Sequence, residues 1–340
     1  MAEADSAAQS RVPSPGPRRL TEVLRATADH PAGKLSQAAH TVISVRDLHM
    51  SYGSFEAVCG IDLDVTAGEV FAFLGPNGAG KTTTVEILEG YRRRSAGEVG
   101  VLGVDPDRGG GAWRARIGVV LQESEPEAEL SVEECVSLYA GYYPAPRPVA
   151  ETIGLVGLAD HATVRCSQLS GGQRRRLDVA LALVGDPELI FLDEPTTGFD
   201  PSARRQAWEV IAGLRSLGKT IFLTTHYMEE AEYLADRIAV IAAGRIVAEG
   251  TPATLGGRDA ESVTIRFTLP ASTTVSDLPA ELTAAVASRT GGLVELAAAN
   301  PLPLLGALVT WAAVRGVELP DLAVFRPTLE EVYLRLTKQP

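Results

Sequence analysis

Cysteine is scarce in this 340-residue sequence, which contains three of them. Cys59, Cys135 and Cys166 lie far apart, and no two of them have a spacing typical of a metal site. An odd number of widely spaced thiols argues against a disulfide framework and favours a reducing compartment.

A long hydrophobic run is also missing. A helix needs about 18 or more apolar residues to span a bilayer, and the nearest candidate, residues 304–314, is shorter and follows Pro301 and Pro303. These residues therefore predict a core helix. The first residues lack the charged and then apolar pattern of a secretory signal. We therefore expect a soluble protein.

An excess of positive charge is absent too, because 31 basic and 43 acidic residues give a net charge of −12. Proteins that bind nucleic acid mainly through its phosphates carry the opposite balance, so we expect no nucleic-acid partner.

The length suits two domains, and a 45% hydrophobic content can form a large core. Residues 1–40 are rich in Ala, Pro and Ser without an aromatic residue, which predicts a mostly disordered tail.

The most informative segment is a glycine-rich loop that matches the pattern G-x-x-x-x-G-K-[ST]. It comprises Gly75, Pro76, Asn77, Gly78, Ala79, Gly80, Lys81, Thr82 and Thr83. A short apolar strand precedes it and a helical segment, 84–89, follows it. In this context backbone N–H groups surround phosphate oxygens, a lysine reaches the β- and γ-phosphates, and the next hydroxyl binds Mg²⁺. We therefore predict ATP and Mg²⁺ as ligands.

Two carboxylates end a second apolar strand, residues 189–192. Ligands of open α/β sheets bind at the carboxyl ends of the strands. Asp193 suits the Mg²⁺ shell, and Glu194 suits a base that polarises the attacking water. A plain acidic turn is disfavoured by the apolar strand and the phosphate-binding loop. His226 follows a third strand, 220–224, although a lone histidine there is more often a structural hydrogen-bonding group.

Helical periodicity dominates from residue 125 to about 183 and predicts a helical subdomain inserted into an α/β core. Within it, Leu169-Ser170-Gly171-Gly172-Gln173 opens a helix for which Ser170 is a suitable N-cap. The arginines at 174–176 are expected to form a solvated rim.

The segment 256–340 predicts a small α+β accessory domain. Residues 261–269 and 293–296 are typical of strands, and 304–314 of a helix. A last helix should begin at Thr328 and bury Leu329 and Val332.

Taken in order, these motifs resemble the nucleotide-binding subunit of an ABC transporter over residues 41–255. The pentapeptide at 169–173, downstream of the phosphate-binding loop, makes the resemblance very specific. It implies a P-loop NTPase cassette with a mostly parallel core sheet, an antiparallel β subdomain and the inserted helical subdomain. Residues 256–340 resemble the tail of drug-export ATPases of the daunorubicin/doxorubicin type.

The resemblance also implies roles for individual residues. Tyr52 would stack on adenine, and Gln122 would contact Mg²⁺ or the water and sense the membrane partner. Glu194 would be the general base, and His226 would hold the γ-phosphate. The residues that would bind ATP on an opposite subunit are Ser170, Gly171, Gly172 and Gln173, and Asp200 belongs to the nucleotide-binding set. Phe199 replaces the leucine usual in the family, which keeps a bulky apolar side chain.

Because one chain carries one copy of each motif, each ATP should lie between two chains, most simply in a homodimer. We expect an exporter ATPase bound to the cytoplasmic face of the cell membrane through a separately encoded membrane subunit. The surface beside Gln122 and the helical subdomain is the candidate docking site.

An importer ATPase remains an alternative, as does a non-transport ATPase that acts on DNA or ribosomes. The short separation of Lys81 and Ser170, 89 positions without heptads, disfavours the latter.

Overall fold

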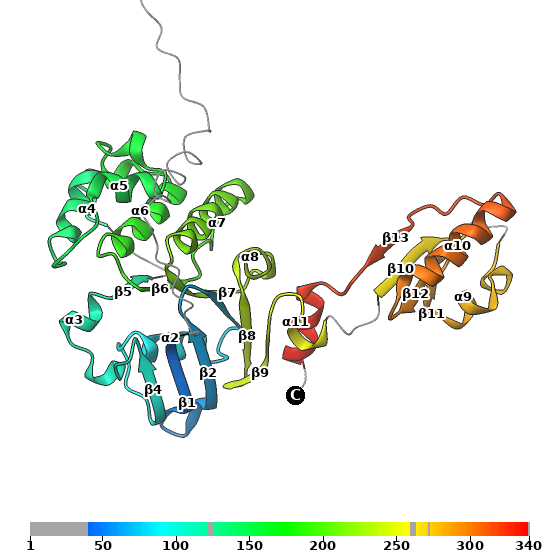
Figure 1. Ribbon diagram of the computed structural model, residues 1–340, viewed down its shortest axis with the longest axis horizontal. Coiled ribbons are helices and arrows are strands. Elements are labelled where there is room, and N and C mark those ends of the chain that lie inside the picture. The colour runs from blue at the N-terminus through cyan, green and yellow to red at the C-terminus, as the bar shows by residue number, and fades with distance from the viewer. Residues whose placement is uncertain (1–39, 122–125, 259–262, 271–272, 339–340) are drawn as a thin grey trace, which may run out of the picture.

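The computed structural model describes residues 40–121, 126–258, 263–270 and 273–338. Figure 1 shows a large α/β body, residues 40–258, and a smaller body to one side of it. Within the described residues, no helix combines the length and the apolar character that crossing a membrane requires.

A six-stranded sheet forms the centre of the large body, in the order β5-β6-β7-β3-β8-β9. Its strands are β3 (Val70–Leu74), β5 (Ile117–Val120), β6 (Leu189–Asp193), β7 (Thr220–Thr225), β8 (Arg237–Ala242) and β9 (Arg245–Gly250). All neighbours are parallel except β8 and β9. Leu74 is in register with Thr225, and Asp193 with Thr224. The loops that follow β3, β6 and β7 therefore meet at one edge of the sheet.

A second, antiparallel sheet packs with helix α2 (Lys81–Leu88) against one face of the first. It consists of β1 (Thr41–Tyr52), β2 (Phe55–Thr66) and β4 (Ala96–Val101) in the order β2-β1-β4. The turn η2 (Pro106–Arg108) and helix α3 (Gly111–Arg114) lead from it to β5. Three phenylalanines of the central sheet, Phe71, Phe191 and Phe222, form the base of the shared core.

Helices cover the other face of the central sheet (Figure 1). The helical subdomain contains α4 (Val132–Ala140), α5 (Val149–Leu155), η3 (Ala159–His161), η4 (Cys166–Gln168) and α6 (Gly171–Leu183). It is followed after β6 by α7 (Pro201–Ser216), and after β7 by α8 (Met228–Leu234). Parallel strands buried on both faces read as continuous apolar runs, which is how their sequences appear. The predicted fold class is confirmed: a mostly parallel core, an antiparallel subdomain and an inserted helical subdomain.

The smaller body, residues 263–325, has a four-stranded antiparallel sheet in the order β11-β12-β10-β13. Its elements are β10 (Val263–Thr268), η6 (Val275–Asp277), α9 (Ala280–Ala284), β11 (Val286–Thr290), β12 (Leu293–Ala298), α10 (Pro301–Arg315) and β13 (Ala323–Phe325). Its hydrophobic core is its own and includes Phe267, Leu296 and Trp311. The expected small α+β unit is therefore present.

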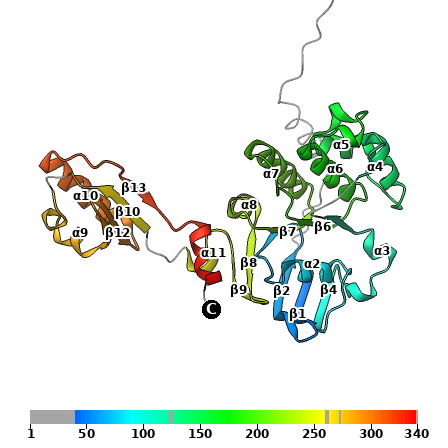
Figure 2. The same ribbon diagram turned by 180° about the vertical axis from the view of Figure 1, so that it is seen from behind.

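The last helix, α11 (Leu329–Lys338), does not join this small sheet. It returns to the large body, where Leu329 packs in one cluster with Leu74 of β3 and Val240 of β8 (Figures 1 and 2). Leu255, in the turn η5 (Leu255–Gly257), belongs to the same cluster. The sequence predicted the helix and its buried face correctly, but it placed the helix in the accessory unit. Helical periodicity identifies a buried face without identifying what that face packs against.

Candidate active site

The glycine-rich loop joins β3 to α2 in a conformation that needs glycine. Gly78 and Gly80 have φ values of 79° and 106°, in the left-handed region that side chains rarely adopt. A Cβ at Gly80 would lie 2.6 Å from the carbonyl oxygen of Ala57, and one at Gly75 would collide with the carbonyl of Ile241. The loop therefore presents bare backbone next to the start of α2, which is the arrangement that binds phosphate.

Lys81 lies inside this loop. It is 7% exposed, and its Nζ donates to the carbonyl oxygens of Gly75 at 2.7 Å and Pro76 at 3.2 Å. Burial lowers the pKa of Lys81, while the nearby carboxylates of Glu194 and Asp193 act in the opposite direction. The next residue, Thr82, is exposed and lines the same cavity as these carboxylates. A hydroxyl and a carboxylate are the hard oxygen ligands that Mg²⁺ prefers, so these residues fit the expected cation.

Thr224 of the neighbouring strand β7 holds the carboxylate of Asp193 and the backbone of Glu194 at the sheet edge. Its hydroxyl donates to Oδ1 of Asp193, and it accepts from the backbone N–H of Glu194 at 3.1 Å. Glu194 has a φ of 46°, an uncommon conformation for a residue with a side chain. Sequence analysis did not identify Thr224; its position beside Asp193 follows from strand pairing.

His226 lies beside Glu194. Its Nδ1 is 3.3 Å from Oε2 of Glu194, and the Thr197 hydroxyl donates to the same oxygen at 3.1 Å. The Glu194 side chain is 14% exposed and that of His226 42%. The structure therefore brings together the two residues that the sequence placed at the ends of different strands.

Tyr52 lines a cavity of about 460 Å³ together with Lys81, Thr82, Asp193 and Glu194. Its hydroxyl is 3.4 Å from that of Thr83, and the ring is 41% exposed. Phe55, opposite Tyr52 across the β1–β2 turn, is 62% exposed and lines the same cavity. Sequence analysis missed Phe55, although its position three residues after Tyr52 in a hairpin was a usable signal.

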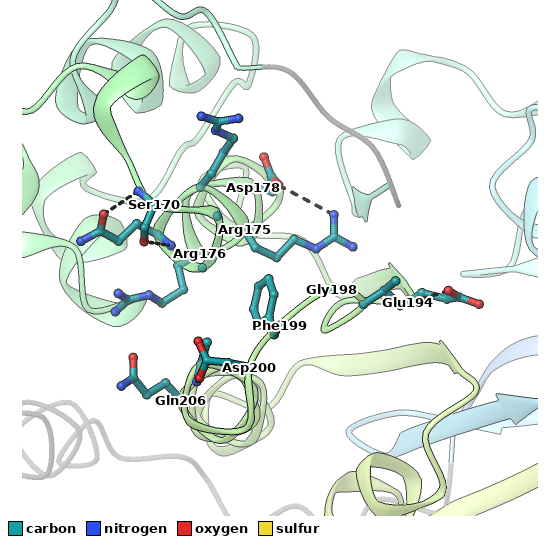
Figure 3. Close-up of a pocket in the computed structure, with 15 residues that line it drawn as sticks. Ser170, Arg175, Arg176, Asp178, Glu194, Gly198, Phe199, Asp200 and Gln206 are labelled. Carbon is teal, nitrogen blue, oxygen red and sulfur yellow. Dashed lines mark hydrogen bonds and ion pairs between the residues drawn. The ribbon is translucent and has the colours of Figure 1, made fainter.

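The pentapeptide lies elsewhere. Ser170 caps α6, accepting from the Gln173 backbone N–H at 3.3 Å, while the Gln173 side chain accepts from the Ser170 N–H at 2.9 Å. Residues 170–173 line a second cavity of about 760 Å³ with Glu194 and residues 198–200 (Figure 3). Asp200 caps α7 there through the N–H groups of Ser202 and Ala203. Lys81 and Ser170 thus line separate cavities, and Glu194 borders both.

Of the three arginines after the pentapeptide, Arg174 is exposed, as predicted, but Arg175 is 8% exposed. The expected solvated rim is therefore wrong for Arg175, whose guanidinium donates to backbone carbonyls of the sheet edge. In α6 it lies on the same side as Asp178 and Val179, which are also buried, while Leu177 belongs to the opposite side. Gln122 falls outside the described residues, so its predicted role has no structural account.

A third cavity, of about 490 Å³, lies between the end of α2, helix α3 and the helical subdomain. Tyr91, 72% exposed, and the exposed Arg114 stand on its rim, and Glu89 lines it from α2. Burial, with smaller contributions from Asp193 and Glu86, raises the pKa of Glu89 to about 8. Val119 of β5, three positions before Gln122, also lines this cavity.

Comparison with known families gives two matches. A family model described as "ABC transporter" matches residues 58–197. A second model, described as the C-terminal domain of ABC transporter domain-containing proteins, matches residues 263–328. The second match covers the small body and stops directly before α11.

Curated relatives match nearly the whole chain. A daunorubicin resistance ATP-binding protein from Streptomyces coeruleorubidus is 39% identical over 307 residues, 88% of this chain and 96% of the relative. A Nod factor export ATP-binding protein from Rhizobium johnstonii is 36% identical over 320 residues, 91% and 98% of the two chains.

Solved structures are similar to a little under two thirds of the chain. The ATP-binding subunit of an ABC transporter is similar with a TM-score of 0.56 at 26% identity, covering 63% of this chain and 91% of that one. A dimeric ATP-binding cassette bound to ADP and phosphate has a TM-score of 0.55 at 24% identity, covering 62% and 98%. The second of these shows likeness of fold.

Proposed function

This chain belongs to the ATP-binding proteins of the ABC transporter family, and from that premise we propose that it is the ATPase subunit of an exporter. ATP hydrolysis is the activity of the family. The observation that carries the direction of transport is the likeness, over almost the full length, to relatives named for drug resistance and for Nod factor export. We propose a drug-like or lipid-like natural product as the cargo class.

The site geometry suggests how this chain handles ATP. The backbone of residues 75–80 and the Lys81 ammonium would hold the phosphates, and Tyr52 would stack on the base. Thr82 and Asp193 would hold Mg²⁺, which when bound neutralises phosphate charge. Glu194 would take the proton of the attacking water. His226, whose Nδ1 is 3.3 Å from the Glu194 carboxylate, would orient that carboxylate and contact the γ-phosphate.

A complete site needs a second chain in this proposal. The phosphate-binding loop and the pentapeptide line separate cavities of the one chain. A head-to-tail pair would place Ser170, Gly171 and Gly172 of each chain over the nucleotide of the other. Closure of two such sites would be the mechanical step, and hydrolysis would reset it.

The membrane subunit would dock in the groove beside β5. This groove lies between the end of the phosphate-loop helix α2 and the helical subdomain. A helix of the membrane subunit that binds in it would therefore contact both α2 and the helical subdomain. We expect Arg114→Glu to uncouple transport from hydrolysis while the isolated chain keeps its basal ATPase activity. Loss of basal activity in this variant would argue against a docking role.

The test of the proposal is a mild detergent extraction of cells that make the tagged chain, with the co-purifying proteins identified by mass spectrometry. We expect one multi-span membrane protein without an ATPase motif of its own. Ribosomes, DNA or an external solute-binding protein in its place would contradict the exporter assignment.

A further inference from the structure

Arg175 is a buried cation that the roles assigned so far do not use. It lies in the second turn of α6, five positions after the capping residue Ser170. Its side chain leaves the helix on the side of Glu194 (Figure 3). Burial lowers the pKa of the guanidinium, although an arginine stays charged. A buried charge is tolerated when its donors are satisfied.

All three guanidinium nitrogens of Arg175 are bonded to backbone carbonyls. Nη2 donates to the carbonyl of Asp193 at 2.8 Å, and Nε donates to that of Pro195 at 3.1 Å. Nη1 donates to the carbonyl of Leu121, and Asp178 Oδ2 lies 3.7 Å from the same nitrogen.

The positions of these carbonyls are informative. Asp193 and Pro195 are the residues immediately before and after Glu194, so one planar guanidinium holds the carbonyl groups of both neighbours of the proposed base. Glu194 is the residue with the uncommon φ of 46°, a conformation that persists when neighbouring contacts fix it. Leu121 directly precedes Gln122.

We propose that Arg175 is a positioning residue that links the pentapeptide helix to the proposed general base. It fixes the direction in which the Glu194 carboxylate points, and its third bond ties the chain leading to Gln122 to the same helix. Movement of α6, when the pentapeptide meets a nucleotide, is thereby transmitted to the segment that carries the base. This inference rests on the role proposed for Glu194.

The experiment compares ATP hydrolysis by Arg175→Met, Arg175→Lys, Glu194→Gln and the two double variants that combine them. Methionine keeps the apolar length and removes every donor. We expect Arg175→Met to lower kcat about 10- to 100-fold, the scale of a misplaced catalytic group, with KM for ATP within about twofold of wild type. Lysine donates as a point charge without the planar fork, so its kcat should be intermediate.

The double variants distinguish positioning from general damage. If Arg175 acts through Glu194, Arg175→Met should change the residual rate of Glu194→Gln by less than about twofold. Independent losses that multiply would overturn the inference. Arg205→Met is the control, since this exposed arginine of α7 lies outside the lining of both cavities and should keep wild-type kcat and KM.

Two outcomes separate this inference from the proposal on which it rests. Wild-type turnover in Glu194→Gln would contradict the role of the base itself. Reduced turnover in Glu194→Gln with normal kcat in Arg175→Met would overturn the positioning role alone. If Arg175→Met does not fold, judged by loss of ATP binding, the kcat of Arg175→Lys decides, and a wild-type value would overturn the proposal.

Discussion

The large ATP-binding body and the small body at 263–325 both combine helices with a sheet over a buried core, yet their sheets differ in kind. In the large body, parallel strands end together, so the loops after β3, β6 and β7 converge on one edge. In the small body, antiparallel neighbours alternate in direction, so the carboxyl ends of its strands are divided between the two edges. The comparison teaches that strand direction, more than hydrophobic content, determines where polar groups can be gathered for chemistry.

Helix α11 connects the two bodies, because it follows the small body in sequence and packs on the large one. The chain therefore leaves the large body after η5, builds the small sheet, and is fixed again at its far end. The small body is thus held at both of its ends rather than attached as a loose tail.

The largest expected effect tests whether chemistry is confined to the large body. Glu194→Gln should lower the turnover of ATP about 10²- to 10⁴-fold, because the amide cannot accept the proton of the attacking water. Thermal unfolding of both bodies should be close to wild type. A steady-state phosphate-release assay measures the turnover. A rate near that of wild type would refute the role of Glu194 as general base.

The next effect tests the independence of the small body. Phe267 is fully buried in its core, and Phe267→Ala should destabilise that body by about 3–5 kcal/mol. Hydrogen exchange should show loss of protection in β10 and β12 with normal basal ATPase activity. A matching loss of protection in β3 and β6 would show that the two bodies unfold together.

A slightly smaller effect tests the link between them. Leu329, 1% exposed, lies in the cluster with Leu74 and Val240. Leu329→Ala should cost about 2–5 kcal/mol, measured by urea unfolding, with the loss of protection in α11, β8 and β3. The exposed Leu334 of the same helix is the control, because Leu334→Ala should change the unfolding free energy by less than about 0.5 kcal/mol. If only the small sheet loses protection, α11 would pack on the small body, and the prediction would be contradicted.

The smallest effect concerns pH and the interior of the large body. Burial raises the pKa of Glu89 from 4.5 to about 8, so the folded state binds the proton more tightly than the unfolded state does. Stability from this group is complete below the unfolded pKa and is lost as the pH rises through the folded one. Between about pH 6 and pH 8, the unfolding free energy of Glu89→Gln should fall about 2 kcal/mol less than that of wild type. Equal pH dependence of the two proteins would contradict a buried, proton-binding Glu89.

Much of the active site could be predicted because its signals are local. The strand before the phosphate-binding loop, its glycines and the carboxylates after β6 are adjacent in sequence, and the residue types at those positions are dictated by backbone geometry and by hard oxygen ligation. Thr224 and Phe55 escaped prediction because their contribution depends on strand register and on a turn, which bring distant or unremarkable residues to the site.

The sequence by itself determined which segments are strands and helices, where phosphate can bind, and that α6 begins at its capping serine, since these depend on neighbours within a few positions. Tertiary structure alone decided that Arg175 turns inward to hold the carbonyls around Glu194 and that α11 closes on the large body. A charged side chain is buried when distant backbone groups satisfy it, and an apolar helix face packs wherever the folded chain leaves an apolar surface open. The periodicity of a segment identifies neither the carbonyl groups that Arg175 binds nor the surface on which α11 packs.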